Sequence, residues 1–171
     1  MNILQLTPRV PWPANDGGSQ AMLQLAQALR KAGNSLTIAA INTPKHYANP
    51  KQLAQINPAF ATEIDTRIRP TAALKNLLFS DLPYNVARFW SKKHANTLQK
   101  HLNSNEYDLI LLEGVYLALY IEALRSASRA PLVLRAHNVE YAIWQRYADA
   151  EVMGPKRLYF NHLAKRGRRF E

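Results

Sequence analysis

Apolar and polar positions along the chain follow an alternation of strands and helices. Short apolar runs predict buried strands at Asn2–Leu6 and Ser35–Ile41. Between them, a helix begins at Gly17-Gly18 and ends before Gly33-Asn34, with apolar residues at helical spacing, namely Met22, Leu25, Ala26, Leu29 and Ala32. A strand, a loop, a helix and a second strand in this order indicate a right-handed crossover between parallel strands.

The rest of the chain continues this alternation. Further strands are predicted at Ala61–Ile68, with Ile64 and Ile68 on one face, at Tyr107–Glu113 and at Pro131–Leu134. Helices are predicted at Lys51–Ile56, Thr71–Phe79, Ser91–Leu102, Leu117–Leu124, from Asn138 onward and at Lys156–Glu171, with a break at Gly154-Pro155. Because Ser91–Leu102 is polar and basic, we expect that helix to be exposed. The pattern predicts a doubly wound, Rossmann-like α/β three-layer sandwich with five or six mostly parallel strands.

Length and cysteine content narrow the class of protein. A chain of 171 residues fits one domain. The absence of cysteine excludes a disulfide framework, a thiolate nucleophile and a cysteine-ligated metal, and it fits a reducing cytoplasm. The sequence has no apolar run of about 20 residues, the length of a membrane span, and its first residues do not form a signal peptide. We expect a cytoplasmic protein, or one peripheral to the inner face of a membrane.

The charge of the chain is strongly basic and unevenly spread. The net charge is +10, and no acidic residue lies between Asp16 and Glu63. The carboxyl-terminal segment holds six cations, Lys156, Arg157, Lys165, Arg166, Arg168 and Arg169. Such a surface attracts phosphate groups of nucleotides, nucleic acids or anionic lipids, although a merely solvated basic face is equally open.

The first candidate site is the loop at the carboxyl end of the first predicted strand. Prolines in Pro8–Pro13 end that strand, and Gly17-Gly18 begin the helix. Glycine permits close backbone approach and positive φ, and a helix N-terminus suits a phosphate or a sugar hydroxyl. The spacing matches neither the dinucleotide fingerprint nor a P-loop. A tight turn that needs positive φ explains the pair equally well.

The second candidate site follows two later strands. His137 comes just after Pro131–Leu134 and could bond a substrate hydroxyl or change protonation near neutral pH, or could be a capping or interior histidine. Glu113 could face the same crevice or serve as a first-turn helix carboxylate. Arg135 could bind an anionic ligand or pair with Glu140.

The sequence gives little support to a metal site or to a serine hydrolase. Four histidines lie in predicted loops or exposed helices without metal-ligand spacing, so no metal is expected: His46, His94, His101 and His162. The sequence has no G-x-S-x-G elbow, which argues against a serine hydrolase.

Two distant segments resemble one enzyme family. The first comprises Ile3-Leu4-Gln5-Leu6-Thr7, Pro11-Trp12-Pro13 and Asp16-Gly17-Gly18-Ser19; the second is Leu134-Arg135-Ala136-His137-Asn138-Val139-Glu140-Tyr141, followed by Trp144. In order and spacing they resemble the amino-terminal half of GT-B fold glycosyltransferases of group 1, also called GT4. The final Arg168-Arg169-Phe170-Glu171 is similar to that family's connector to its second domain.

The resemblance implies a function and a set of site residues. Enzymes of this family have two Rossmann-like domains, the first for the acceptor and the second for the nucleotide-sugar donor, and transfer sugar with retention and without a required metal or cofactor. His137 is then the catalytic residue that contacts and positions the transferred sugar, while Gly17 and Gly18 lie near the donor phosphates and the acceptor. Catalysis would rest on orientation and on electrostatic stabilisation of the leaving phosphate. The candidate substrate-binding residues are Asp16, Gly17, Gly18, Glu113, Arg135 and Asn138.

The resemblance also implies a domain plan and partners. Residues 1–155 would form the acceptor-side domain, and residues 156–171 a basic helix leading to a donor domain outside the chain. We therefore expect the chain to be inactive alone, because the family's paired-glutamate donor motif is not in it. The expected partners are a nucleotide-sugar, a glycan or lipid-linked acceptor of bacterial cell-surface polysaccharide synthesis, and an anionic membrane; nucleic acid is not expected.

Two alternatives stay open. The chain could be a non-catalytic basic α/β module that binds nucleic acid, which steeply salt-dependent DNA binding would favour. It could also be a flavodoxin-like or epimerase-like nucleotide binder, although it lacks a complete phosphate fingerprint.

Overall fold

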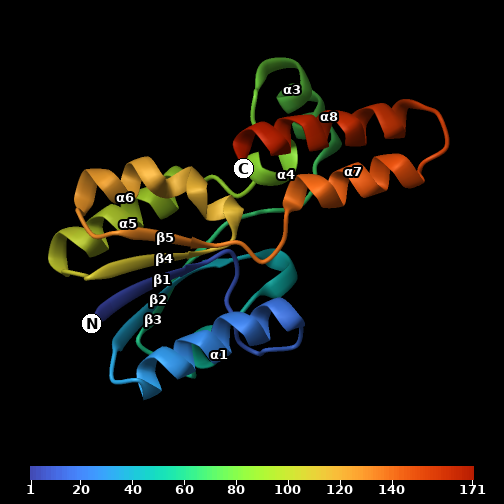
Figure 1. Cartoon of the computed structure of the whole chain (residues 1–171). Helices are drawn as coiled ribbons and strands as arrows, with labels where there is room; N and C mark the ends of the chain where they lie inside the picture. Colours follow the sequence, from blue (N-terminus) through green and yellow to red (C-terminus); the bar gives the residue numbers. More distant parts are fainter. The chain divides into compact units, whose positions relative to one another are not determined.

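A five-stranded parallel sheet forms the centre of the fold. The computed structural model describes residues 1–171. The strands are β1 (Asn2–Thr7), β2 (Ser35–Asn42), β3 (Ala59–Glu63), β4 (Leu109–Glu113) and β5 (Leu132–Arg135). Their order is β3-β2-β1-β4-β5, and every neighbouring pair is parallel (Figure 1). The strand order reverses between β1 and β4, which confirms the predicted doubly wound α/β fold.

Ten helical segments connect and follow the strands. They are α1 (Gly17–Lys31), the 3₁₀ helix η1 (Pro44–His46), α2 (Pro50–Ala54), α3 (Pro70–Phe79), α4 (Tyr84–Ala87), α5 (Lys92–Ser104), the 3₁₀ helix η2 (Val115–Tyr120), α6 (Ile121–Ala127), α7 (Glu140–Ala150) and α8 (Pro155–Phe170). None of these helices combines the length and the apolar character of a membrane span.

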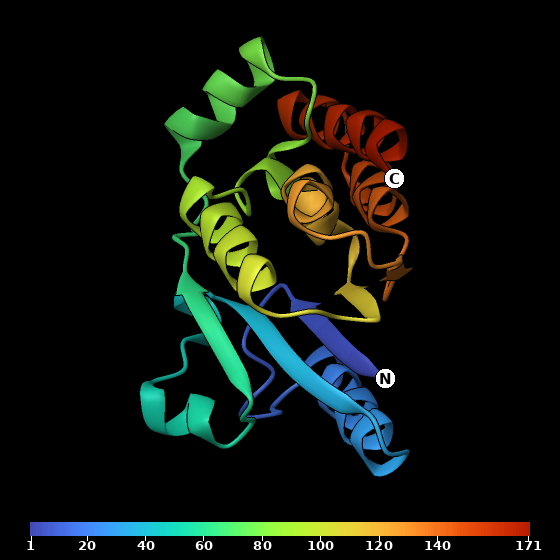
Figure 2. The same cartoon turned by 90° about the vertical axis from the view of Figure 1, so that its left-hand side faces the viewer.

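Side-chain alternation along the strands creates two apolar faces. Helices α1 and α2 lie on one side of the sheet, and α5 and α6 on the other (Figures 1 and 2). On β1, Ile3 and Gln5 point toward α1, because the Gln5 side chain donates a hydrogen bond to the carbonyl of Met22. The core on the α1 side also contains Leu23, Ala26, Leu36, Ile38, Ala40, Ile56 and Leu111. Burial on both faces explains why β1 and β2 read as nearly continuous apolar runs.

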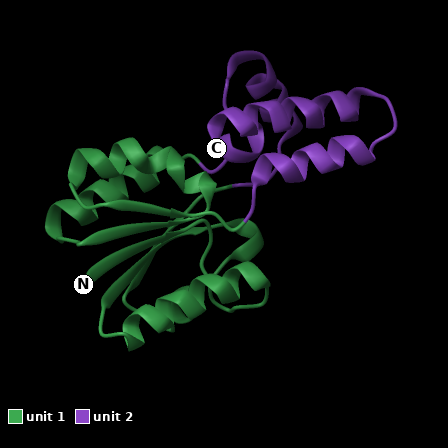
Figure 3. Ribbon diagram, in the orientation of Figure 1, with its two compact units in different colours: residues 1–65, 90–137 green, residues 66–89, 138–171 purple.

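The chain divides into two compact units. The first comprises residues 1–65 and 90–137 and contains the sheet; the second comprises residues 66–89 and 138–171 and contains α3, α4, α7 and α8 (Figure 3). This division differs from the expected boundary after residue 155. Helix α8 packs against α7 within the second unit, so it is part of a folded helical group.

Strand β3 is shorter and begins earlier than the predicted Ala61–Ile68. It ends at Glu63, which is paired with Asn42, the last residue of β2. Beyond Asn42 no strand is available to pair with, so the chain leaves the sheet. Ile64 is buried just past the strand, whereas Ile68 is exposed.

Helix α5 is not the exposed helix that its polar composition predicts. Its residues His94, Ala95, Leu98 and Leu102 are buried. Their spacing of one, three and four residues places them on one narrow stripe of the helix. A narrow stripe is easily missed in a helix whose other positions are polar.

Candidate functional site

Polar side chains gather at the carboxyl edge of β1, β4 and β5 in the first compact unit. Glu113 and Arg135 are the last residues of β4 and β5 and face each other in register. His137 follows β5 by two residues, and Gln5 lies on β1. This edge flanks the point where the strand order reverses, the usual ligand position in open α/β sheets.

Glu113 is the centre of a hydrogen-bonded network. Its side chain is fully buried. Gln5 Nε2 donates to Glu113 Oε1 at 2.8 Å, and His137 Nε2 lies 2.7 Å from Oε2. Arg135 Nη1 lies 3.4 Å from both carboxylate oxygens. These partners compensate the cost of burying a carboxylate. Glu113 is the last residue of β4 and is buried, so it is not a first-turn helix carboxylate, and any effect of it on a ligand would pass through His137 and Arg135.

His137 is held by Glu113 and is still accessible. Its side chain is 24% exposed. Because the carboxylate offers only acceptors, the imidazole donates from Nε2. The Nδ1 atom is then left to accept a hydrogen bond or a proton from a ligand hydroxyl. The structure thus disfavours a purely interior or capping role for this histidine.

Arg135 pairs with Glu113, and it also donates from Nη1 to the carbonyl of Ala21 on α1 at 3.2 Å. Its side chain is partly exposed, so the other guanidinium N–H groups can meet an anion. Asn138 is exposed and belongs to the second compact unit, so the network within the first unit does not include it.

Asp16 caps α1. Its Oδ1 accepts from the Ser19 backbone N–H at 3.0 Å, its Oδ2 accepts from the Ser19 hydroxyl at 3.0 Å, and Arg9 Nη2 donates to Oδ1 at 2.5 Å. Burial by itself would raise the pKa of Asp16, but the bonds from Ser19 and the charges of Arg9 and His46 outweigh it and lower the pKa. Its carboxylate oxygens are thus used in organising the loop, and substrate binding by Asp16 is not needed to explain it.

Gly17 and Gly18 are the first two residues of α1, and neither has a positive φ. The tight-turn explanation for this pair is therefore wrong. At Gly18 an added Cβ would lie 2.4 Å from Arg9 Nη2, so glycine allows the guanidinium to pass close to the backbone. At Gly17 an added Cβ would meet nothing within 4 Å. Asp16 accepts the Ser19 N–H of the first turn, so the N–H groups of Gly17 and Gly18 are the ones that could meet an anion at this helix N-terminus.

The structure adds residues that carry no sequence motif. Gln5 Oε1 and Thr7 Oγ1 are buried near the same edge without a hydrogen-bond partner. Their only sequence signal is polarity at alternate positions of an apolar strand. A pocket of about 160 Å³ also lies beside the loop that precedes α1, lined by Val10, Trp12, Asn15, Lys45, His46 and Gln52. Burial lowers the pKa of His46, and the charges of Arg9 and Lys45 lower it further, against an opposing effect of Asp16.

The structure places no three carboxylate or imidazole groups together as a potential metal cluster. The residues at the carboxyl edge suit hydrogen bonding to an uncharged hydroxyl and contact with an anion. The expectation that no metal or cofactor is needed stays a prediction.

Comparisons with known proteins inform the fold. No protein-family model and no curated protein matches the chain. Among solved structures, it is similar to the C-terminal domain (residues 78–226) of a hydrogenase from Pyrococcus furiosus. The match has a TM-score of 0.51 and 12% sequence identity, and it covers 78% of this chain and 89% of that one. At this identity, the likeness supports the α/β fold alone.

Proposed function

We propose that the chain is the acceptor-side domain of a retaining, metal-independent glycosyltransferase. The enzyme would transfer sugar from a nucleotide-sugar to a glycan or lipid-linked acceptor in bacterial cell-surface polysaccharide synthesis, in the cytoplasm. The observation that carries the proposal is the 2.7 Å contact between His137 Nε2 and the buried Glu113 carboxylate at the carboxyl edge. The two segments that resemble the GT-B family include Gln5, Arg135 and His137 of this network.

In this proposal His137 is the catalytic residue and Glu113 is a positioning residue. Glu113 fixes the ring orientation and directs Nδ1 away from the carboxylate. The free Nδ1 accepts a hydrogen bond from a hydroxyl of the transferred sugar and so restricts its orientation. Gln5 helps to hold Glu113 in place, because its Nε2 group donates hydrogen bonds to both Glu113 and the Met22 carbonyl.

The N-terminus of α1 and Arg135 supply the positive potential. The first-turn N–H groups at Gly17 and Gly18 suit a phosphate or a sugar hydroxyl, and Arg135 adds a fixed guanidinium. Such fixed donors would stabilise charge that develops on a leaving phosphate. This part of the proposal needs no metal ion.

The net charge of +10 favours nucleic-acid binding, but the contacts of α8 argue against it. Arg166 donates to the carbonyls of Asn76 and Leu77. Lys156 pairs with Glu151 and lies over the Phe160 ring, and Arg168 lies over Tyr141. Several cations of the basic segment thus take part in packing, which weakens its interpretation as a nucleic-acid surface.

A glycan-binding screen tests the proposed function. The purified chain is applied to an array of bacterial polysaccharide fragments, with His137→Ala and His101→Ala as variants. His101 is a matched control, since it lies on α5 and contacts Tyr107. We expect selective binding that His137→Ala weakens about tenfold, roughly the value of one hydrogen bond, and that His101→Ala leaves intact. Absence of selective binding, or equal loss in both variants, would argue against the proposal.

A further inference from the structure

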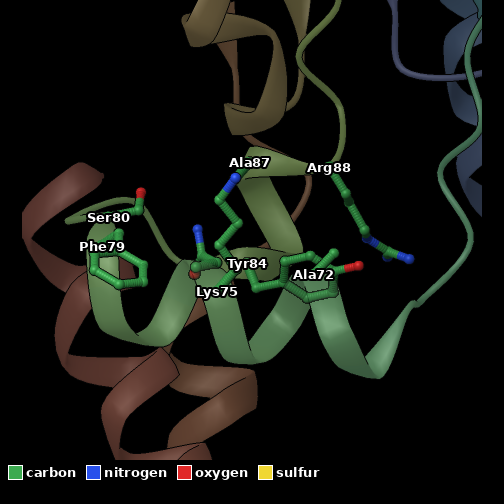
Figure 4. Close-up of a pocket in the computed structure, with 8 residues that line it drawn as sticks. Ala72, Lys75, Phe79, Ser80, Tyr84, Ala87 and Arg88 are labelled. Carbon is green, nitrogen blue, oxygen red and sulfur yellow. The ribbon is translucent and has the colours of Figure 1, made fainter.

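A pocket lies between α3 and α4 in the second compact unit. Its volume is about 310 Å³, within the range of small-molecule sites, roughly 300–1,000 Å³. Phe79 lies toward one end and Arg88 toward the other, with Lys75 and Tyr84 between them (Figure 4). All of the lining residues belong to the second unit, so the pocket does not depend on the first unit.

Two aromatic rings and two small side chains form the apolar part of the pocket. Phe79 is 79% exposed, so most of its ring surface is uncovered. Tyr84 is buried, and its hydroxyl accepts from the Arg69 backbone N–H at 3.0 Å, so what it offers to the pocket is its ring. Ala72 and Ala87 leave room beside these rings. Aromatic rings favour another ring as a neighbour, in an offset-stacked or edge-to-face arrangement.

The pocket is formed before any ligand binds. Helix α3 has no buried residue of its own. It is held from α8 by Arg166, which donates from Nη1 to the Asn76 carbonyl at 3.1 Å and from Nη2 to the Leu77 carbonyl at 3.0 Å. A ligand therefore does not have to repay the entropy of ordering this helix.

Two cations line the pocket and can still meet an anion. Lys75 is exposed and forms no ion pair in the protein. Arg88 donates from Nε to the Asn85 carbonyl at 3.3 Å and from Nη1 to the Thr66 carbonyl at 2.8 Å, and its guanidinium lies over the Phe89 ring. These contacts fix the Arg88 side chain and leave its Nη2 group for a ligand.

No carboxylate lines the pocket. The nearest acidic residues in the sequence are Asp65, which precedes α3 and has an interaction of its own, and Asp81, which follows α3 and is exposed. Neither belongs to the lining. The charge that the pocket presents to a ligand is therefore positive, and its complement is an anionic group.

We infer that the pocket between α3 and α4 binds an aromatic carboxylate. The ring of the ligand packs against Phe79 and Tyr84, and its carboxylate meets Lys75 and Arg88 Nη2. An alkyl carboxylate would lack the ring contacts, and a neutral aromatic molecule would leave both cations without an acceptor. The inference rests on the second unit alone and does not require sugar transfer.

An NMR titration of the full chain tests the inference with three probes. They are 2-naphthoate, 2-naphthol, which has the same rings without the charge at neutral pH, and octanoate, which has the charge without a ring. We expect 2-naphthoate to shift the backbone amides of α3 and α4 with one saturation curve. The other two probes should bind about tenfold more weakly, because each lacks one of the two kinds of contact.

Two variants and their matched controls locate the ligand. Lys75→Gln should weaken 2-naphthoate about tenfold and leave 2-naphthol unchanged, whereas Lys51→Gln, at an exposed lysine of α2, should change neither. Ala72→Leu fills the pocket and should abolish binding of both aromatic probes. Ala73→Leu introduces the same side chain on α3 outside the lining and should bind like the parent chain. Circular dichroism melting verifies that each variant is folded.

Several results would overturn the inference. Absence of saturable shifts in α3 and α4 with 2-naphthoate removes the site. Equal affinities for 2-naphthoate and 2-naphthol remove the carboxylate from the ligand class, and an equal affinity for octanoate removes the ring. Undiminished binding by Ala72→Leu, or equal losses in Lys75→Gln and Lys51→Gln, would show that the probes bind elsewhere.

Discussion

Glu113 links strand β4 to the candidate site through three side chains. Removing its carboxylate leaves Gln5 Nε2 and Arg135 without their buried acceptor. Glu113→Ala should therefore lower the free energy of unfolding by about 1–3 kcal/mol. His137→Ala, at a partly exposed side chain, should lower it by less than about 1 kcal/mol. Urea denaturation at neutral pH measures both values, and a larger loss in His137→Ala than in Glu113→Ala would contradict the network described above.

Gly17 and Gly18 are adjacent but should respond differently to alanine. Gly18→Ala would force the Arg9 guanidinium away from Asp16 and Ser19, at a cost of about 1 kcal/mol. Gly17→Ala meets no neighbour, and its φ is not positive, so it should be neutral or stabilising by up to about 1 kcal/mol. Thermal or chemical denaturation of the two variants makes the comparison. Equal destabilisation would show that both positions need glycine for the backbone.

The sequence indicates candidate polar residues of the site, but it does not indicate which of them bond to one another. Glu113, Arg135 and His137 could be selected because each follows an apolar run. Their mutual bonding could not be predicted, since the pairing of β4 with β5 fixes it. Gln5 carries no such signal, because a single polar residue in a buried strand resembles a satisfied core residue.

Helix α5 contains a buried histidine, His94. Both ring nitrogens of His94 lack hydrogen-bond partners, and the ring meets Tyr120 edge-on with centroids 4.9 Å apart. Burial lowers the pKa of His94 from 6.5 to about 4. Between these values the unfolded chain binds a proton that the folded chain excludes, so stability is lost as pH falls through that window.

Replacing His94 with leucine should remove this acid sensitivity. A pKa difference of this size corresponds to about 3 kcal/mol in the parent chain at pH 4. The unfolding free energy of His94→Leu should therefore fall less than that of the parent between pH 6.5 and pH 4. Urea denaturation across this range provides the values. Parallel pH profiles for the two proteins would exclude a neutral, buried His94.

Arg166 should control the order of α3 through its bonds to the Asn76 and Leu77 carbonyls. In Arg166→Ala the last turn of α3 loses these donors and should open more often. Hydrogen exchange followed by mass spectrometry should show faster exchange in α3 and unchanged exchange in α1. Unchanged exchange in α3 would mean that other contacts hold the helix.

Helices and strands whose bounds depend on local sequence alone can be predicted from the hydrophobic pattern. The strands β1 and β2 and helix α1 follow from periodicity and from the stop at Gly33-Asn34. The end of β3 depends on where its partner β2 ends, and the burial of α5 depends on the sheet beneath it. Such tertiary effects are absent from a local pattern.

At the scale of the whole molecule, the order of the strands places the polar candidate residues at one edge of the sheet. The strand order β3-β2-β1-β4-β5 brings the ends of β1, β4 and β5 together. In the sequence, β1 is separated from β4 and from β5 by more than 100 residues. The division into two units was not expected, because residues 66–89 and 138–171 join from separate parts of the sequence. The basic charge, by contrast, could be predicted from composition, but its use in the packing of α8 could not.

In the proposed function, His137 and the N-terminus of α1 bind one sugar-containing ligand. The direct measurement is NMR of the chain, with labelled histidine rings and backbone amides, during titration with UDP-glucose and GDP-mannose. The account predicts that the His137 ring and the Gly17 and Gly18 amides shift together with one saturation curve, while His101 does not shift. An unperturbed His137 ring at saturation, or shifts confined to surface lysines and arginines that disappear in high salt, would contradict it.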